Sequence, residues 1–367
     1  MSQGPYKIHF KMIGNFTKDI GSYITWLFQT CLTSGIFPQI FKERCIIPLL
    51  KPGKKSNTIP KNYRPVSLTS VLGKILERIM ENRLMEYIIS NDLLNPENYG
   101  FLKARSTTDA IVNLVDNIRI AHGYNLDVTG VCIDFSSAFD NIDNEILYDR
   151  LKVHYGLSGN LLELIRDFTR NRYSYTMVND KKSERRKQYK GVPQGSPISP
   201  AIFILYISPI YYIVKKYKRI SIQFYADDII LTIDGSDEEA HKILNECIEE
   251  ICGWTKNNGL PINIKKCDHI VWRRGHKKNK KQYDIKIYCE ETQRMKAIPK
   301  KDAIKYLGVW IDFKLKFHKH LSYVYKNMIN LKNSLNKVIK RNKIYPDVYI
   351  RLYKATVLPA VRYCDIL

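Results

Sequence analysis

The sequence predicts a mixed α+β fold, and three observations support this prediction. Strand-like and helix-like segments follow one another without strict alternation, which argues against a single doubly wound parallel sheet. The stretch "QFYADDIIL" (223–231) places one strand-like segment before two adjacent Asp residues and another after them, as in a β-hairpin. With 367 residues and 44% hydrophobic content, the chain is long enough for two or three lobes with their own cores.

The first third of the chain combines helices with one short strand. In residues 20–41 the apolar side chains fall on one side of a helix, and Ser, Thr and Gln fill the other side. Residues 43–54 indicate a buried strand followed by a basic Pro/Gly turn. Residues 62–88 and 97–122 each pass from a loop into a helix, and the second has the N-cap-like sequence "STTD".

The middle of the chain begins with an apolar strand, "DVTGVCIDF" (127–135). Helical patterns follow at 144–156 and 160–172. Residues 173–191 predict a hairpin that turns at "ND" and has a strongly basic tip. The apolar run 201–207 is too short to span a membrane and predicts a buried helix.

After the "ADD" hairpin we expect a helix at 236–258, a basic stretch at 273–281 and one strand in "KYLGVWID" (305–312). A last helix has apolar residues three or four positions apart, which predicts one apolar stripe beside a basic face. The stripe consists of Leu321, Val324, Met328, Leu331, Leu335 and Val338.

The charge of the chain predicts a polyanionic partner. Lys and Arg total 59 against 36 Asp and Glu, a net charge of +23, so we expect nucleic acid or an anionic membrane surface. The 8 cysteines are scattered without a CxxC pair, as in reduced, mostly buried thiols of an intracellular protein. The N-terminus is too polar for a signal peptide, and the uncharged stretches 20–41 and 191–214 suit soluble elements. We therefore expect a protein of the nucleus, the cytoplasm or both, without a membrane segment.

Asp227 and Asp228 are neighbouring carboxylates that repel each other at a turn. A divalent cation offsets such repulsion, but Asx turns also tolerate Asp, so the nonapeptide alone leaves both interpretations open. Asp134 ends the strand "GVCIDF" and by itself suits a strand-terminating turn. If its strand lies beside the hairpin, Asp134 and Asp227 can converge on two metal ions roughly 3.5–4 Å apart, as in phosphoryl transfer.

The segment "GVPQGSPISP" (191–200) predicts a rigid loop that a ligand can approach closely. Gly191 and Gly195 lack side-chain bulk, and three prolines stiffen the path. Gln194 offers both a donor and an acceptor to a base or sugar edge. A Gly/Pro loop alone is weak evidence for a site.

In this order and at these spacings, "CIDFSSAFD", "GVPQGSPISP" and "FYADDIIL" resemble the palm motifs of reverse transcriptases. Flanking stretches narrow the resemblance to polymerases of non-LTR (LINE-like, jockey-type) retrotransposons. They include "NYRPVSLTSVLGKILERIM", "YGFLKARSTTDAI", "NNGLPINIKKC", "KYLGVWID" and "LYKATVLPAVRYC". The resemblance covers nearly the entire chain and implies an α+β right-hand polymerase fold. The implied domains are an N-terminal helical segment (1–45), fingers (46–125), a palm with an antiparallel sheet and the basic hairpin 172–190 (126–312), and a partial helical thumb (313–367).

The resemblance also implies the catalytic residues. Asp134, Asp227 and Asp228 would be the catalytic carboxylates, and the first two would be the main ligands of two Mg²⁺ ions, with Mn²⁺ as an alternative. The backbone carbonyl of Phe135 would be a further ligand. Phe139 falls where related enzymes have a steric gate against the ribose 2′-hydroxyl, although a core aromatic ring is a competing interpretation.

Further positions match residues that contact substrates in the family. Lys103 and Arg105 match finger residues that meet the triphosphate, and Gln194 would touch the incoming nucleotide or the template. Lys266 resembles the lysine proposed to protonate pyrophosphate, with Lys265 beside it as a rival. The remaining matches are Arg64, as a template-backbone contact, and Tyr306, Leu307 and Gly308, which resemble the primer grip.

The predicted function is RNA-directed DNA polymerisation: extension of a DNA primer 3′-hydroxyl with dNTPs on an RNA template. The family more often has "GFRKGRS" where this chain has "GFLKARS", so Leu102 removes one potential contact and Ala104 stiffens the loop. Such elements usually encode an endonuclease before this region and more protein after it. We therefore keep as an alternative a truncated, catalytically impaired nucleic-acid-binding remnant. An RNA-templated RNA polymerase and a two-metal nuclease are further rivals; Phe139 argues against the former and the Gln194 loop against the latter.

Overall fold

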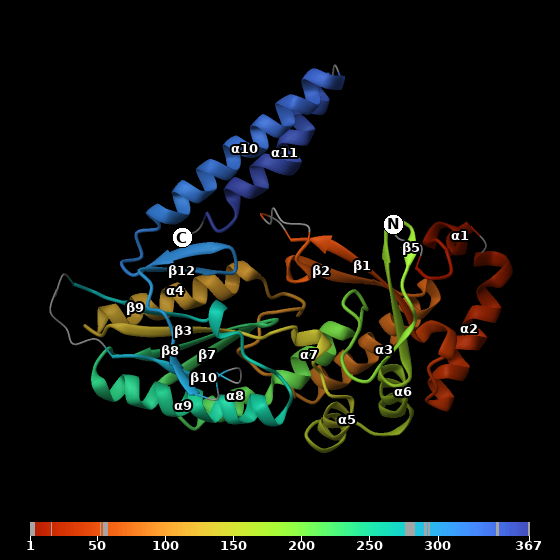
Figure 1. Cartoon of the computed structure of the whole chain (residues 1–367), viewed down its shortest axis with the longest axis horizontal. Helices are drawn as coiled ribbons and strands as arrows, with labels where there is room; N and C mark the ends of the chain where they lie inside the picture. The colour runs from red at the N-terminus through yellow and green to blue at the C-terminus, as the bar shows by residue number, and fades with distance from the viewer. Residues whose placement is uncertain are drawn as a thin grey trace. The chain divides into compact units, whose positions relative to one another are not determined.

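The computed structural model describes most of the chain and divides it into two compact units (Figure 1). The described residues are 4–15, 17–51, 53, 58–275, 283–289, 292, 294–342 and 345–365, so most of the predicted basic stretch at 273–281 lies outside them. The first unit comprises residues 1–96, 135–210 and 254–261, and the second comprises 97–134, 211–253 and 262–367.

A five-stranded sheet organises the first unit. Its strand order is β2-β1-β4-β5, and β6 also pairs with β4. Strands β1 and β4 are parallel, whereas the other pairs are antiparallel. The strands are β1 (Glu43–Leu50), β2 (Tyr63–Leu68), β4 (Arg172–Val178), β5 (Lys181–Lys182) and β6 (Arg186–Gln188). The predicted turn between β4 and β5 is confirmed, because Asn179 and Asp180 both have positive φ, 47° and 60°, as a type I′ turn requires.

The helices of the first unit are α1 (Phe10–Asn15), α2 (Thr17–Ser34), α3 (Val71–Ser90), α5 (Asn144–Val153), α6 (Gly159–Thr169) and α7 (Ser199–Ile207). Helix α3 buries every fourth residue completely, namely Leu76, Met80, Leu84 and Ile88. Helix α7 is the buried helix predicted from its apolar run, and all of its residues except Pro200 are buried. A helix that is apolar on all sides needs such a position.

A four-stranded antiparallel sheet, ordered β7-β8-β3-β9, organises the second unit. Its strands are β3 (Val128–Asp134), β7 (Ile220–Tyr225), β8 (Asp228–Asp234) and β9 (Asp268–Trp272). The helices chiefly in this unit are α4 (Thr107–Gly123), α8 (Pro209–Lys215), α9 (Glu238–Asn257), α10 (His318–Asn342) and α11 (Pro346–Arg362). Helix α4 lies on one face of the sheet and α9 on the other (Figure 1). Gly130 of β3 leaves room for the Trp272 ring, which a Cβ atom would approach to 2.3 Å.

Two small hairpins complete the second unit. They are β10 (Lys286–Cys289) with β11 (Arg294–Ala297), and β12 (Ala303–Tyr306) with β13 (Val309–Asp312). The prediction of one strand in "KYLGVWID" is therefore wrong. Leu307 and Gly308 have positive φ, 44° and 91°, and reverse the chain in the middle of that stretch.

The predictions about membrane-spanning helices and about cysteines can be compared with the structure. No described helix combines the length and apolar character that crossing a membrane requires. The seven cysteines whose side chains the structure describes are free thiols, and six of them are buried. This agrees with the prediction of reduced, mostly buried thiols.

Candidate active site

Two of the predicted catalytic carboxylates lie directly opposite each other in the second unit. Asp134 ends β3 and Asp228 begins β8, and the two residues are partners in the antiparallel register. Because Tyr225 also pairs with Asp228, Ala226 and Asp227 form a two-residue turn between β7 and β8. The predicted hairpin is therefore confirmed, and its turn lies beside the end of the strand that carries Asp134.

The segment before α4 supports this turn from the edge of β7. The Phe224 amide donates to the Glu97 carbonyl at 3.0 Å, and the Tyr99 amide donates to the Phe224 carbonyl at 2.8 Å. Gly100 follows, and a Cβ atom at this position would lie 2.5 Å from the Ala226 nitrogen. Ala226 itself has a φ of 55°, a conformation that L-residues rarely adopt. The turn is thus held by backbone contacts that only glycine at position 100 permits.

Lys266 is bound to the first carboxylate. Its Nζ donates to both oxygens of Asp134, at 2.8 and 3.0 Å. A short 3₁₀ turn, Ile264–Lys266, directs the side chain there, and the Asn263 amide donates to the Asp134 carbonyl at 2.8 Å. Of the two adjacent lysines considered from the sequence, Lys266 is the one that reaches the carboxylates.

Desolvation and repulsion between neighbouring carboxylates determine the electrostatics of this cluster. The pKa of the Asp228 carboxyl is raised to about 6, first by desolvation and then by the neighbouring Asp227 and Asp134 carboxylates. The Lys266 ammonium acts in the opposite direction but does not cancel the effect. Among the described residues, no three His, Cys, Asp or Glu side chains are gathered closely enough to hold a metal ion as they stand. The cluster therefore presents a surplus of negative charge with one lysine as its counter-ion.

The residues predicted to contact the triphosphate, Lys103 and Arg105, and those predicted to form the primer grip, 306–308, also belong to the second unit. Arg105 donates to the Asn98 carbonyl at 2.5 Å and lies over the Tyr99 ring, 5.4 Å from its centroid, while Lys103 is exposed. Ala104 between them has a φ of 58°, a left-handed conformation that glycine adopts more readily than alanine. The sequence interpretation that Ala104 merely stiffens the loop missed this left-handed conformation.

Tyr306 lies next to the β12–β13 turn and is buried. Its side chain is 3% exposed, and its hydroxyl has no hydrogen-bond partner within the described part of the chain. Burial, followed by the influence of Cys132, Asp228 and Tyr99, raises the pKa of Tyr306 well above its ordinary value. Leu307 and Gly308 form the turn itself and are partly exposed, whereas Tyr306 is buried.

The Gly/Pro loop is part of the first unit, where it packs on the turn that follows Asp134 in sequence. The Gly191 amide donates to the Ile142 carbonyl at 2.7 Å. Gln194 donates from Nε2 to Asp140 Oδ2 at 2.8 Å, and its carbonyl accepts from the Ser67 amide at 3.0 Å. A Cβ atom at Gly191 would lie within 2.8 Å of the Asp140 backbone. The close approach predicted for Gly191 is thus to protein backbone, and it fixes the loop that carries Gln194.

Asp140 was missed in the sequence, although it stands in the quoted motif "CIDFSSAFD". Desolvation raises the pKa of its carboxyl, while Arg44 and the Gln194 hydrogen bond lower it. No spacing rule could have paired Asp140 with Gln194, because the two residues are 54 positions apart. Their hydrogen bond orients the Gln194 amide, leaving its side-chain oxygen as an acceptor.

The other predicted residues of the first unit have mixed environments. Phe139 is half-buried, and its ring stacks on Phe203 with centroids 4.9 Å apart and an interplanar angle of 29°. It thus has the packing of a core aromatic residue together with a partly accessible ring. The Phe135 side chain is 2% exposed, and Arg64 is exposed on β2.

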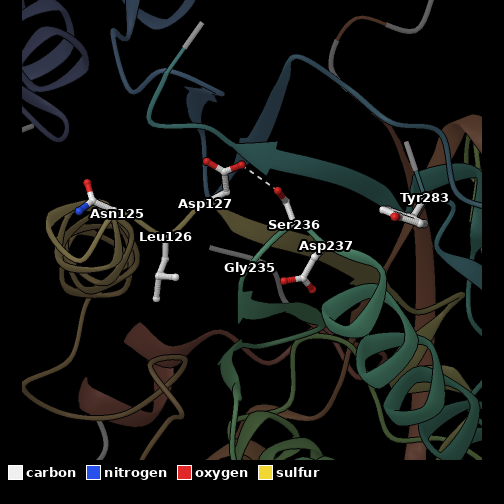
Figure 2. A pocket seen from close by; sticks show the side chains of 7 residues that line it. All are labelled: Asn125, Leu126, Asp127, Gly235, Ser236, Asp237 and Tyr283. Atoms are coloured by element: carbon white, nitrogen blue, oxygen red, sulfur yellow. Dashed lines mark hydrogen bonds between the residues drawn. The ribbon is translucent and has the colours of Figure 1, made fainter. Parts of the chain in front are cut away.

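A separate cavity of about 280 Å³ lies at the other end of strands β3 and β8 (Figure 2). It is lined by Asn125, Leu126, Asp127, Gly235, Ser236, Asp237 and Tyr283. Asp127 accepts a 2.7 Å hydrogen bond from Ser236 Oγ, and Asp237 Oδ1 accepts from the Ala240 amide at the start of α9. Both carboxylates serve local structure, and this cavity is not the active site.

An antiparallel sheet with facing Asp residues at two strand ends and a third Asp in the adjoining turn is the arrangement expected of a polymerase palm, and the fold is the right-hand polymerase fold. The family model described as "Reverse transcriptase (RNA-dependent DNA polymerase)" matches residues 51–311. The chain therefore belongs to the reverse transcriptase family, and among its members it is similar to the polymerases of non-LTR retrotransposons.

Two curated relatives show this similarity. The probable RNA-directed DNA polymerase from transposon BS of Drosophila melanogaster is 28% identical over 333 residues, which are 86% of this chain and 35% of that protein. The RNA-directed DNA polymerase from mobile element jockey of Drosophila funebris is 27% identical over 349 residues, 93% of this chain and 37% of that protein. The chain thus spans about a third of the length of these relatives.

Solved structures support the fold. The apo telomerase of Candida tropicalis, truncated from its C-terminal domain, matches with a TM-score of 0.51 and 12% identity. The match covers 81% of this chain and 59% of that one. At this level of identity the likeness concerns the fold alone.

Proposed function

We propose that the chain is an RNA-directed DNA polymerase that extends a DNA primer 3′-hydroxyl with dNTPs on an RNA template. The observation that carries this proposal is the cross-strand pairing of Asp134 with Asp228, with Asp227 in the adjoining turn between β7 and β8. Family membership supplies the reaction class. The excess of 59 Lys and Arg over 36 Asp and Glu supports a nucleic-acid substrate. With such substrates, the protein would act in the nucleus, the cytoplasm or both.

The carboxylate cluster fits divalent cations of the Mg²⁺ type. Its donors are hard oxygens, and after desolvation the neighbouring Asp227 and Asp134 carboxylates raise the pKa of Asp228, which Lys266 opposes without cancelling the effect. Asp134 and Asp227 would be the main ligands of two Mg²⁺ or Mn²⁺ ions, with the Phe135 carbonyl as a further ligand. When bound, such ions offset the charge that develops as the primer hydroxyl displaces pyrophosphate from the α-phosphate.

The remaining residues would bind and orient the substrates. Lys103 and Arg105 would contact the triphosphate, and Gln194, held by Asp140, would contact the nucleotide or the template. The partly accessible Phe139 ring would exclude a ribose 2′-hydroxyl. Lys266, already beside Asp134, would give a proton to the leaving pyrophosphate.

Nucleic-acid contacts would extend over several parts of the chain. Arg64 and the basic hairpin at 172–190 would contact the template strand, and the turn at Tyr306, Leu307 and Gly308 would contact the primer. These roles agree with the division into fingers (46–125), palm (126–312) and partial thumb (313–367), which remains a proposal.

The test is primer extension on a short RNA template with Mg²⁺ and dNTPs. We expect the natural chain to extend the primer, and we expect a double variant, Asp227→Asn with Asp228→Asn, to lose about 10³-fold or more in rate because it lacks two groups that act directly. The matched control is Asp234→Asn, an exposed Asp at the other end of β8, which should extend normally. Extension by the double variant, or no extension by the natural chain while it binds RNA, would contradict the proposal.

A further inference from the structure

The end of α11 returns to the β12–β13 turn. Tyr363, directly after the helix, donates from its hydroxyl to the Leu307 carbonyl at 2.6 Å. Its ring also covers Gly308, because a Cβ atom on that glycine would lie 3.4 Å from the ring. Tyr363 thus touches both residues of the turn, although it lies 56 positions from Leu307 in the sequence.

This return is anchored in the core of the second unit. Cys364, the next residue, is 6% exposed, and its Sγ lies 3.8 Å from the Thr108 hydroxyl of α4. Cys364 belongs to the buried cluster that contains Tyr306 and Val309, and Tyr363 packs against that cluster. The packing of Tyr363 and Cys364 on this cluster therefore fixes the position of the Tyr363 hydroxyl at the turn.

The turn needs such support. Leu307 has a φ of 44°, which its side chain disfavours, and Gly308 has a φ of 91°. A residue in this region persists only where surrounding contacts hold it. The Tyr363 hydroxyl binds the carbonyl of Leu307, so it acts on the backbone of the strained residue itself.

The start of α10 also contacts the β12–β13 hairpin. Asp312, the last residue of β13, accepts from the Phe317 amide at 2.6 Å just before α10 begins. Lys319 of α10 lies over the Trp310 ring of β13, with its Nζ 3.5 Å from the centroid. The end of α11 lies near β12, so the start of α10 and the end of α11 both lie beside the β12–β13 hairpin (Figure 1).

We propose that Tyr363 is a positioning residue that sets the Leu307–Gly308 turn and thereby the primer terminus. The inference rests on the proposed function in one respect, namely that this turn contacts the primer. Tyr363 contacts no reacting atom; it acts through the backbone of Leu307. The effect of its hydroxyl should consequently appear in the use of the primer and not in the use of the dNTP.

The test compares Tyr363→Phe, which removes only the hydroxyl, with Tyr363→Leu, which also removes the ring. The matched control is Tyr353→Phe on α11, a half-buried tyrosine whose ring packs near Tyr349. Steady-state extension gives the KM for primer–template and the KM for dNTP. Fluorescence anisotropy gives the Kd for a labelled DNA–RNA heteroduplex without dNTP, which does not depend on catalysis.

We expect Tyr363→Phe to raise the Kd and the KM for primer–template about fivefold, the usual effect of losing one neutral hydrogen bond. The KM for dNTP should stay unchanged, Tyr363→Leu should have a larger effect, and Tyr353→Phe should have none. Equal heteroduplex Kd values for the natural chain and Tyr363→Phe would overturn the inference, as would an equal effect of the Tyr353 control. Failure of the natural chain to extend any primer would instead contradict the proposed function, and the anisotropy comparison would still decide the role of Tyr363.

Discussion

At the scale of single residues, the β7–β8 turn that contains Asp227 depends on the absence of a side chain at Gly100. The segment Glu97–Gly100 is hydrogen-bonded to Phe224, so neither the segment nor the turn can move away without breaking the two backbone bonds. Any side chain at position 100 would meet the Ala226 nitrogen at 2.5 Å, well inside van der Waals contact. Asp227 follows Ala226 directly, and a shift at Ala226 therefore moves a carboxylate.

We expect Gly100→Ala to lower the rate of primer extension at least about a hundredfold, since small misplacements of reacting groups have effects of that size. Heteroduplex binding should remain within about twofold, because the substitution removes no basic residue. Gly123→Ala at the end of α4 is the control, since a Cβ atom there meets nothing within 4 Å. Extension at the natural rate by Gly100→Ala would show that the turn adapts and that this contact does not position Asp227.

At the scale of elements, periodicity and turn chemistry were sufficient to predict the β7–β8 hairpin, the β4–β5 turn and helix α7. The same reasoning predicted one strand where β12 and β13 form a hairpin, because Leu307 gives no sign in the sequence that it adopts a positive φ. Local sequence patterns were sufficient to identify Asp134 and Asp227 as candidate metal ligands. They could not supply Asp140 or Tyr363, whose partners are distant in the sequence and are brought near only by the tertiary fold.

The buried His269 of β9, which contacts His241 of α9, makes the stability of the fold depend on pH. His269 of β9 is 1% exposed, and its Nε2 has no hydrogen-bond partner among the described residues. Desolvation, followed by the charges of His241 and Lys300, lowers the pKa of His269 to about 3. The unfolded chain binds this proton near the ordinary value of 6.5, so between pH 6.5 and 3 the unfolded state holds more protons. The contribution of neutral, buried His269 to the free energy of unfolding is therefore full above pH 6.5 and decreases as the pH falls from 6.5 towards 3.

We expect the free energy of unfolding to fall by about 1.4 kcal/mol from this residue alone between pH 7.5 and 5.5. Asp228 and Glu77, whose pKa values are raised to about 6 and 7, act in the opposite direction, so the natural chain must be compared with a variant. His269→Phe should remove this 1.4 kcal/mol difference in urea denaturation at the two pH values. His154→Phe, at an exposed position, should keep it. An unchanged pH dependence in His269→Phe would contradict the assignment.

At the scale of the whole molecule, the net charge of +23 is spread over both units and predicts that electrostatics dominate nucleic-acid affinity. The hairpin of β4, β5 and β6 concentrates part of this charge on an exposed surface, with every residue from 181 to 187 exposed. Two of its cations are already ordered on tyrosine rings: Lys182 lies 3.9 Å from the Tyr175 centroid, and Arg185 lies 3.9 Å from that of Tyr173. Ordered cations lose less entropy when they meet phosphates.

We therefore expect a steep salt dependence of heteroduplex binding, to which this hairpin contributes measurably. Replacing four of its cations by Gln (Lys181, Lys182, Arg186 and Lys187) should reduce the magnitude of the negative slope of log K against log salt by about 0.7–0.9 for each phosphate that the hairpin then leaves unneutralised. The control replaces four exposed cations on helices, Arg83, Lys152, Lys242 and Lys256, with the same change in net charge. If long-range attraction by the net charge explained the affinity, both sets would change the slope equally. If the hairpin contacts the phosphate backbone of the nucleic acid, only the first set of substitutions will change the slope. Anisotropy titrations from about 50 to 200 mM salt distinguish these two explanations.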